Sequence, residues 1–382
     1  MANEFPLLSF VIPCLNESRT IAEVIEECHQ GGQQIEGNYE VIVADNGSSD
    51  GSRDIAIAHG ARVVEVLTRG YGAALSAGID AAKGKYVLMG DADSTYEFRQ
   101  AWQFLERLQQ GNDLVMGNRF QGSIAPGAMP LLHRYLGNPI LSMLGRMFFG
   151  IKIGDFHCGL RAFDRKALQV LNLRCSGMEF ATEMIIKSSL LDLAMAEIPT
   201  NLRPNPPGRS PHLKTWRDGW RHLKFMLSFA PKYSLLSVSV LLLLLAASLV
   251  FCFILRLAPF TGANSLVFAA TLSVASISIL SDYLLTREMI YNSLALHKSQ
   301  HSLLVDRLLG LHRGTDRLFK LAANAICVAL LLFCILCIFS FRGELSRPAS
   351  ALTGFFACTF ALSSILIYLT AAKITSYRAF HY

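Results

Sequence analysis

The distribution of hydrophobic residues divides the chain into two halves. Up to about residue 220, short apolar runs alternate with polar and charged segments. Beyond that point lie four long apolar runs, at about 233–255, 265–285, 321–341 and 351–372. Each is close to the ~20 residues that a helix needs to cross a bilayer. We therefore expect a soluble domain over 1–212 and an all-α membrane domain of four transmembrane helices over 231–382.

Within the first half, runs typical of buried strands alternate with helical segments. We expect strands at 7–12, 39–44, 86–90 and 114–117, and helices at 18–29, 51–58 and 72–82. This alternation predicts an α/β domain with a mostly parallel, Rossmann-like sheet and helices on both faces. Ligands of such a sheet gather at the carboxyl ends of its strands.

The segment that joins the two halves, residues 213–230, carries apolar residues at helical spacing. Trp216, Trp220, Leu223 and Leu227 recur beside basic side chains. This pattern predicts an amphipathic helix in the membrane interface, although a helix docked on the soluble domain would show a similar pattern. The tryptophan pair and the adjacent apolar run favour the interface.

Basic residues are distributed unevenly among the links between the apolar runs. The long link 287–320 carries six, whereas the short links 256–264 and 342–350 carry three between them. The positive-inside rule then places the long link, both termini and the soluble domain on the cytosolic side. We also expect no signal peptide, because the first apolar stretch leads through Pro13 into polar residues.

Composition and charge indicate which partner and which cellular compartment to expect. Charged residues make up only 17% of the chain, and the net charge of +6 is concentrated beside the apolar runs. This arrangement favours the lipid bilayer over nucleic acid as a partner. The nine cysteines show no regular spacing, which indicates a reducing compartment rather than a disulfide framework.

Three polar clusters follow expected strands. Residues 13–17 (PCLNE) follow the first strand, residues 45–51 (DNGSSDG) follow the second, and the D-x-D motif, Asp91-Ala92-Asp93, follows 86–90. The first two clusters could bind a ribose or a base, but turn chemistry explains them equally well. Two carboxylates at the end of a buried strand can hold Mg²⁺ or Mn²⁺ against phosphates.

Further candidate residues lie between the D-x-D motif and residue 183. Arg119 and Arg134 suit phosphate binding, although either could be a surface charge. The segment 154–161 (GDFHCGLR), which we call the site loop, combines Asp155 with Arg161. Zinc at this loop is not favoured, because no second Cys/His cluster completes a set of four ligands. Glu179 and Glu183 share a helix face, and a solvated acidic face would look the same.

Taken together and in order, these segments resemble family 2 glycosyltransferases of the GT-A fold. The resemblance covers about residues 5–225 and rests on VIPCLNE, EVIVADNGSSDGS, GYGAALSAGIDAAKG, DADSTYE, GNRF, GDFHCGLRAF and GMEFATEM. Within the family, the chain is similar to the polyprenyl-phosphate sugar synthases, which include dolichyl-phosphate glucose and mannose synthases. The C-terminal apolar runs resemble the membrane anchor of the bacterial members, which implies a place in the inner membrane of a bacterium. The Q-x-x-R-W motif of processive synthases is absent from the sequence.

The resemblance implies an inverting transfer of one sugar, glucose or another hexose, from a nucleotide sugar to undecaprenyl or dolichyl phosphate at the cytosolic leaflet. It implies Mg²⁺ or Mn²⁺ at Asp91 and Asp93, and catalytic roles for Asp93, Arg119, Arg134 and Asp155. The nucleotide sugar would be bound by Pro13, Leu15, Asn16, Glu17, Asp45, Asn46, Gly72, Asp91, Ala92, Arg203 and Arg209.

Two departures from the family pattern and two alternative functions stay open. Asn46 stands where many members have a second Asp, and His157-Cys158 replaces a Thr-Ser-like pair. UDP-glucose is the first donor candidate, ahead of GDP-mannose and UDP-N-acetylglucosamine. The first alternative is transfer to a lipid hydroxyl such as that of diacylglycerol, with Glu179 or Glu183 as the base. The second is a lipid- or sugar-binding membrane protein without chemistry. Nucleic acid is not expected as a partner, and a homo-oligomer is compatible with the sequence.

Overall fold

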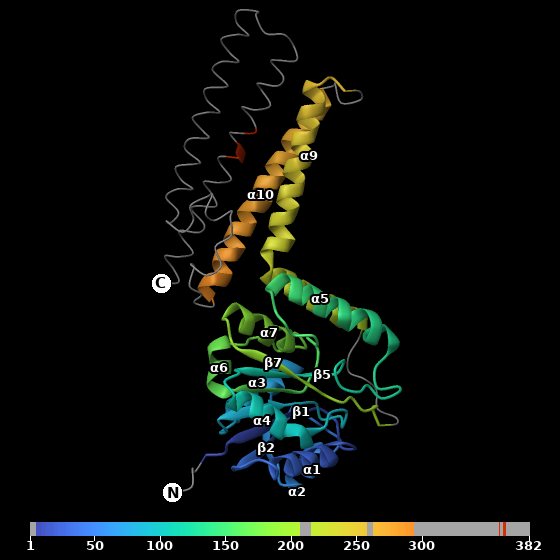
Figure 1. Cartoon of the computed structure of the whole chain (residues 1–382), viewed down its shortest axis with the longest axis vertical. Coiled ribbons are helices and arrows are strands. Elements are labelled where there is room, and N and C mark those ends of the chain that lie inside the picture. Colours follow the sequence, from blue (N-terminus) through green and yellow to red (C-terminus); the bar gives the residue numbers. More distant parts are fainter. Residues whose placement is uncertain (1–4, 207–214, 258–262, 294–358, 360–361, 364–382) are drawn as a thin grey trace, which may run out of the picture. The chain divides into compact units, whose positions relative to one another are not determined.

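The computed structural model describes residues 5–206, 215–257, 263–293, 359 and 362–363 (Figure 1). The chain divides into two compact units, Met1–Met226 and Leu227–Tyr382. The first unit holds all the strands of the described residues, and the second holds the long apolar helices.

A seven-stranded mixed sheet forms the centre of the first unit. Its strands follow the order β3-β2-β1-β4-β6-β5-β7, and only β6 runs antiparallel to its neighbours. The prediction of a mostly parallel sheet is confirmed. The strands are β1 (Leu8–Cys14), β2 (Tyr39–Asp45), β3 (Arg62–Glu65), β4 (Tyr86–Met89), β5 (Leu114–Asn118), β6 (Arg161–Asp164) and β7 (Met195–Pro199).

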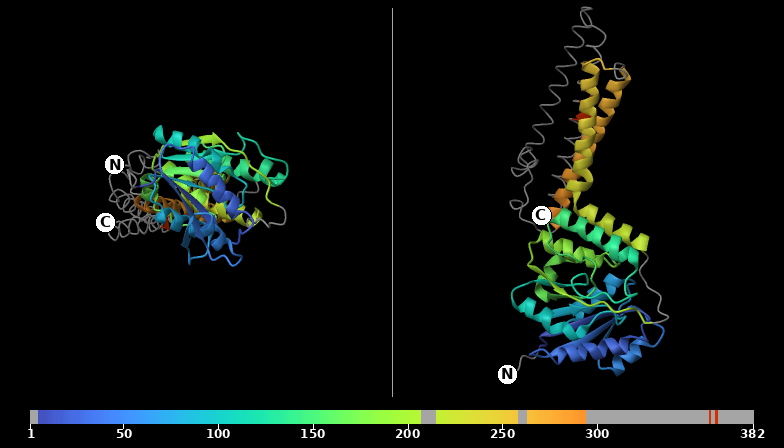
Figure 2. Two further views of the ribbon diagram at one scale, coloured as in Figure 1. Left: turned by 90° about the horizontal axis from the view of Figure 1, so that it is seen from below. Right: turned by 45° about the vertical axis from the view of Figure 1, so that its right-hand side comes forward.

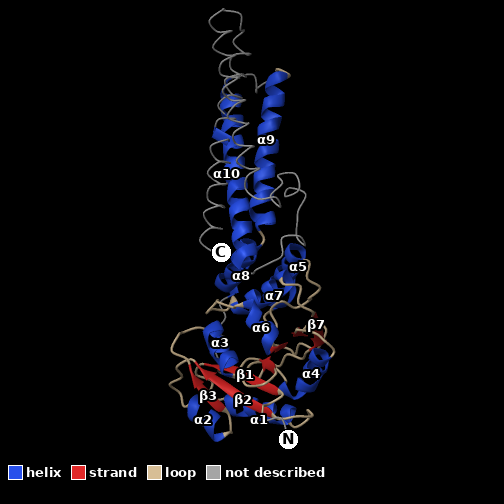
Figure 3. Cartoon of the chain, turned by 90° about the vertical axis from the view of Figure 1, so that its left-hand side faces the viewer, coloured by secondary structure: helices blue, strands red, loops and turns tan. Residues whose placement is uncertain are grey.

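Helices cover both faces of the sheet, as predicted (Figure 3). Side chains of neighbouring residues point to opposite faces of a strand, and the core separates accordingly. Phe10 of β1 packs in the cluster of α1 and α4, whereas Val11 packs in the cluster of α3 and α7. The helices of this unit are α1 (Ile21–Gly32), α2 (Ser52–Ala58), α3 (Tyr71–Ala81), α4 (Ala101–Gln109), α5 (Asn138–Phe149), α6 (Arg165–Leu171), α7 (Phe180–Leu190) and α8 (Thr215–Phe229).

The register of the central strands brings the predicted clusters to one edge of the sheet. Cys14 at the end of β1 pairs with Asp45 at the end of β2, and Val11 pairs with Met89 at the end of β4. The segments that follow these three strands therefore leave the sheet side by side.

The second unit contains two helices that are long and apolar enough to cross a membrane. The candidate spans are Lys232–Ile254, which includes a π-helical turn (Lys232–Leu236) and α9 (Ser237–Ile254), and Ser265–Ile290 within α10 (Ala263–Ser293). These helices run side by side (Figure 2), and reciprocal hydrogen bonds join Ser239 and Ser276. They match the first two predicted spans. The spans predicted at 321–341 and 351–372 lie outside the described residues, apart from positions 359, 362 and 363.

Candidate active site

The loops after β1 and β2 are bonded into one wall. The Asn16 N–H donates to Ser48 Oγ at 2.9 Å, and the Glu17 N–H donates to Ser52 Oγ at 2.8 Å. The Asp45 carboxylate is buried and accepts the Ser48 N–H at 3.2 Å. Two clusters that the sequence presents separately are therefore one structure. Pro13 and Leu15 lie half-buried on its β1 side.

The side chain of Asn46 binds within the protein. Its Nδ2 donates to the carbonyls of Val66 and Thr68 at 3.2 and 2.8 Å, and its Oδ1 accepts the Gly70 N–H at 2.8 Å. An Asp could not donate to the two carbonyls, because a carboxylate only accepts. The Asn46 amide thus stabilises the local fold, independently of any contact with the nucleotide sugar.

The start of α3 packs tightly against residues 175–177. A Cβ at Gly70 would collide with the Ser176 carbonyl, and a Cβ at Gly72 would collide with that of Cys175. Gly70 also has φ +139, which residues with side chains rarely adopt. Close packing of α3 therefore accounts for both glycines, and the nucleotide-sugar contact expected of Gly72 stays a prediction.

The D-x-D motif is held by hydroxyl groups. Tyr71 Oη donates to Asp91 Oδ1 at 2.9 Å, and Asp93 Oδ1 accepts from Thr95 Oγ1 at 2.6 Å. Burial, followed by the charge of Asp91, raises the pKa of Tyr71, so its hydroxyl stays a donor. Ala92 is buried, and its carbonyl accepts from Thr20 Oγ1 at 2.6 Å.

The chemistry of this motif fits a magnesium or manganese ion. Asp91 and Asp93 offer carboxylate oxygens, which hard cations prefer. The described residues hold no group of three or more His, Cys, Asp or Glu that could bind a metal. Mg²⁺ is commonly bound by one or two carboxylates together with substrate phosphates, so two protein ligands suffice.

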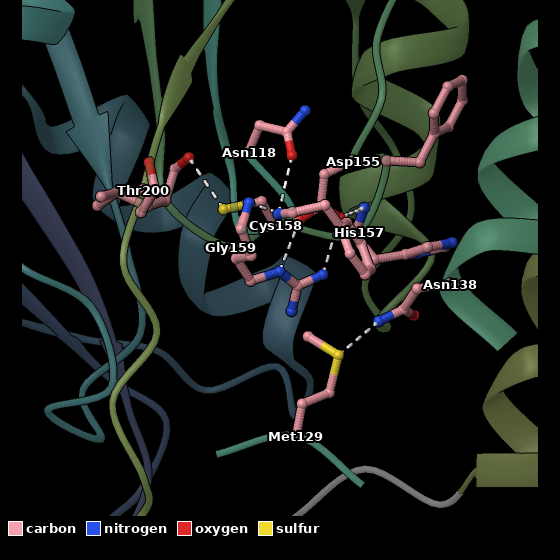
Figure 4. Close-up of polar contacts among 12 residues, drawn as sticks. Asn118, Met129, Asn138, Asp155, His157, Cys158, Gly159 and Thr200 are labelled. Atoms are coloured by element: carbon pink, nitrogen blue, oxygen red, sulfur yellow. Dashed lines mark hydrogen bonds and ion pairs between the residues drawn. The ribbon is translucent and has the colours of Figure 1, made fainter. Parts of the chain in front are cut away.

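A buried ion pair joins Arg119 to Asp155. Figure 4 shows Asp155 among the neighbouring residues of the site loop, His157, Cys158 and Gly159. Arg119 Nε donates to Asp155 Oδ2 at 2.7 Å and Nη2 donates to Oδ1 at 2.8 Å, while the backbone N–H groups of Arg119 and His157 add bonds of 3.1 and 3.2 Å. Asp155 is completely buried. Burial alone would raise the pKa of Asp155, but the charge and hydrogen bonds of Arg119 bring it below its usual range. Asp155 therefore orients Arg119. The sequence predicts separate roles for the two residues and does not predict that they pair.

The site loop passes directly beside the D-x-D motif. A Cβ at Gly159 would lie 2.6 Å from Asp91 Oδ2, and the Gly159 N–H donates to Tyr96 Oη at 2.9 Å. Arg161 is completely buried, with Nε donating to the Cys158 carbonyl and Nη2 to the Phe156 carbonyl at 2.8 and 2.9 Å. Arg161 thus holds the site loop in place through two of its backbone carbonyls, and Gly159 of the loop lies against Asp91, a predicted metal ligand.

Arg134 lies on a π-helical turn, His133–Gly137, ahead of α5. Its guanidinium carbon lies 5.6 Å from the centre of the Tyr135 ring. Burial and then the charge of Arg119 lower the pKa of His133, the preceding residue. The positive charge of Arg119 therefore acts on the turn that carries Arg134.

Arg203 is engaged by carboxylates. It donates to Glu27 at 2.7 Å and to Glu97 at 3.4 Å. The positive charge of Arg203 is therefore balanced by acidic neighbours in the structure. Its donor contact and that of Arg209 remain predictions, and Arg209 lies outside the described residues.

A contact between His157 of the site loop and His222 of α8 was not anticipated. The rings of His157 and His222 lie edge to face with centroids 5.0 Å apart, and His222 Nδ1 lies 2.8 Å from Thr182 Oγ1. Burial, with the influence of His222, lowers the pKa of His157 to about 3, so its ring is neutral near pH 7. The partners are 65 positions apart in the sequence, where no local pattern could have paired them.

The two carboxylates considered as a base are both paired. Glu179 binds Arg221 at 2.7 Å. Glu183 is buried, binds Lys187 at 2.7 Å and accepts the N–H groups of Arg174 and Cys175. Both glutamates thus have structural roles around α7.

Comparison with known proteins places the chain in a family. A family model described as glycosyl transferase family 2 matches residues 9–171. A dolichyl-phosphate hexose transferase from Haloferax volcanii is 31% identical over 201 residues, which cover 52% of this chain and 84% of that protein. The chain belongs to glycosyl transferase family 2. The family expected from the motifs is confirmed.

Two further proteins are similar to this family 2 chain. The low-salt glycan biosynthesis hexosyltransferase Agl6 of Haloferax volcanii is 40% identical over 229 residues, or 60% of this chain. The chain spans only 55% of the length of that relative. The glucosyl-3-phosphoglycerate synthase of Mycobacterium tuberculosis has a solved structure with 25% identity and a TM-score of 0.48, covering 59% of this chain and 80% of that chain.

Proposed function

We propose that the protein is a membrane-anchored inverting glycosyltransferase that moves one hexose from a nucleotide sugar to a polyprenyl phosphate. The observation that carries the proposal is the contact between the D-x-D motif and the site loop, which joins a donor-type acidic motif to the buried Arg119–Asp155 pair. The 31% identical relative named as a dolichyl-phosphate hexose transferase supports this acceptor.

The donor would lie over the carboxyl ends of β1, β2 and β4. The wall formed by residues 13–17 and 45–52 faces the nucleoside, with Asp45 as the buried carboxylate near the ribose. Asp91 and Asp93 would hold Mg²⁺ or Mn²⁺, which neutralises diphosphate charge when bound. UDP-glucose remains the first donor candidate, ahead of GDP-mannose and UDP-N-acetylglucosamine.

The acceptor phosphate would be held by Arg119 and Arg134. Asp155 aligns Arg119 through Nε and Nη2, so that Nη1 stays outside the ion pair. A phosphate monoester has its second pKa near ~6 and is largely a dianion at neutral pH. Its oxygen can attack the anomeric carbon without a strong general base, and the reaction then depends on positioning and charge neutralisation.

Transfer to a lipid hydroxyl is less well supported by the site. A hydroxyl is a weak nucleophile and needs a base close to it. Glu179 and Glu183, the candidates from the sequence, are bound to Arg221 and Lys187.

The membrane half would anchor the enzyme. We propose four spans, with the domain of residues 1–212, the interfacial segment 213–230 and both termini at the cytosolic leaflet of a bacterial inner membrane. Two candidate spans in the described residues and the exposed Trp216 and Trp220 of α8 support this arrangement.

An acceptor comparison tests the proposal. Full-length protein with the donor and Mg²⁺ would be offered undecaprenyl phosphate, undecaprenol or diacylglycerol, and the lipid products would be identified by mass spectrometry. We expect a hexosyl phosphodiester from undecaprenyl phosphate alone. A glycoside formed on diacylglycerol would contradict the proposed acceptor and favour the hydroxyl alternative.

A further inference from the structure

Helix α5 buries two small residues and exposes three large apolar side chains, Ile140, Met143 and Met147. Its fully buried residues are Ser142 and Gly145. Ser142 Oγ accepts the Phe156 N–H at 3.2 Å, and a Cβ at Gly145 would lie 2.5 Å from the Phe156 ring. By contrast, Met143 and Met147 are each 51% exposed. The apolar side chains of a surface helix usually face the core, so an exposed apolar face of this kind is unusual.

The exposed apolar side chains form one continuous stripe. Successive members are three or four residues apart, which places them on one side of the helix. We call this stripe the α5 strip; it consists of Leu132, Leu136, Ile140, Met143 and Met147, each between 39% and 51% exposed. Leu131 and Tyr135 beside it are still more exposed, at 73% and 69%. Extended apolar surfaces of this kind mark sites that bind a protein or a membrane.

The charge around the strip indicates which of these it binds. Residues 114–154 contain no Asp or Glu, whereas Arg119, Arg134, Arg146 and Lys152 are basic. Arg119 is buried in its pair with Asp155, whereas Arg134, Arg146 and Lys152 are partly or well exposed. An apolar stripe on a segment whose charged side chains are all basic is complementary to a bilayer with anionic head groups. Helix α8, which lies at the same end of the first unit, exposes Trp216 and Trp220 at 79% and 58% (Figure 3). Tryptophan is enriched at the level of lipid head groups.

We propose that the α5 strip is a lipid-docking surface, which inserts among the head groups and upper acyl chains of an anionic bilayer. Arg134 stands on the turn that begins this strip, so docking would hold that arginine at the level of lipid phosphates. The consequence for catalysis rests on the proposed function, whereas the docking itself does not.

Photochemical labelling tests the docking without any need for activity. The full chain, with benzoylphenylalanine at Met143, would be reconstituted in vesicles of phosphatidylglycerol and phosphatidylethanolamine and irradiated. The matched control carries the same group at Ile57, which is 55% exposed on α2 at the opposite end of the first unit. We expect lipid adducts at position 143, at least about tenfold more abundant than at position 57. A cross-linked pair of chains, a cross-link within one chain, or equal labelling at the two positions would overturn the proposal.

A second arm connects docking with the reaction. Ile140→Glu together with Met143→Glu places two carboxylates in the strip, and neither residue belongs to the catalytic site. We expect transfer to undecaprenyl phosphate in anionic vesicles to fall by about tenfold, equivalent to ~1.4 kcal/mol. Transfer to a short, water-soluble isoprenyl phosphate should stay unchanged. An equal loss with both acceptors would mean that the substitutions disturb the site rather than docking. Lipid adducts in a protein that transfers no sugar would keep the docking surface and reject the proposed function.

Discussion

Removing the charge of Asp155 should destabilise the first unit strongly. In Asp155→Asn, the guanidinium of Arg119 stays buried but loses its counter-ion, and an amide N–H would face the N–H donors that the carboxylate accepted. Breaking a buried ion pair by removing one partner costs about 3–5 kcal/mol. For a domain of this size, that corresponds to a fall in Tm of roughly 10 °C.

Thermal unfolding of the full chain in detergent, followed by tryptophan fluorescence, measures this loss. All three tryptophans lie within Met1–Met226, so the signal reports on the unit that contains the pair. The matched control is Glu65→Gln, which breaks the exposed Arg53–Glu65 pair. Exposed pairs contribute about 0–1 kcal/mol, so the control should melt almost like the wild type.

A double variant distinguishes the cost of an unpaired buried charge from the cost of losing the two side chains. Replacing both partners, as in Asp155→Asn with Arg119→Met, removes the orphaned charge and should cost less than the sum of the two single substitutions. If Asp155→Asn melts within a degree or two of the wild type, or if the two losses simply add, the reasoning about this ion pair is wrong.

Three further predictions concern the site loop, the histidine pair and the membrane half. Gly159→Ala should abolish most activity with little loss of stability, because the added methyl group would collide with the carboxylate of Asp91. The control Gly219→Ala, which has open space around it, should be as active as the wild type. A fully active Gly159→Ala enzyme would contradict this geometry. The low pKa of His157 means that the unfolded chain binds a proton near pH 6.5 and the folded chain does not until about pH 3. The contribution of His157 to stability should therefore be complete above pH 6.5 and fall as the pH drops below it, by up to about 2 kcal/mol at pH 5. The difference in Tm between pH 7.5 and pH 5 should be smaller in His157→Gln than in the wild type. An unchanged difference in Tm would refute the low pKa of His157. A reporter fused near Gly310 should be cytosolic and one near Gly262 extracytoplasmic, and the opposite result would invert the proposed topology.

Much of the fold could be predicted from the sequence because its strands are buried and continuous. The four expected strands and three expected helices are present, with no end shifted by more than three residues. Strands β3, β6 and β7 were not anticipated. β3 and β6 have only four residues each, and β6 begins inside the site loop, where its polar neighbours suggested a turn.

The sequence predicted which candidate residues lie near one another better than it predicted which of them pair. Clusters that follow parallel strands must meet at one edge, so the neighbourhood of Asp45 and Asp91 followed from the order of the motifs. The pairing of Arg119 with Asp155, and of Arg203 with Glu27, depends on how distant segments pack, and no spacing in the sequence carries that information. The same limit applies to α5, whose outward-facing apolar side chains resemble those of a core helix until its burial is known.

The most direct test of the account is transfer of labelled hexose to undecaprenyl phosphate by the full-length protein. The assay would use a panel of UDP-glucose, GDP-mannose and UDP-N-acetylglucosamine with Mg²⁺ or Mn²⁺, beside the variant Asp93→Asn. The account predicts an acid-labile hexosyl phosphodiester with one of these donors, and a loss of orders of magnitude in the variant while its Tm is retained. No lipid product with any donor, or a fully active Asp93→Asn variant, would contradict it.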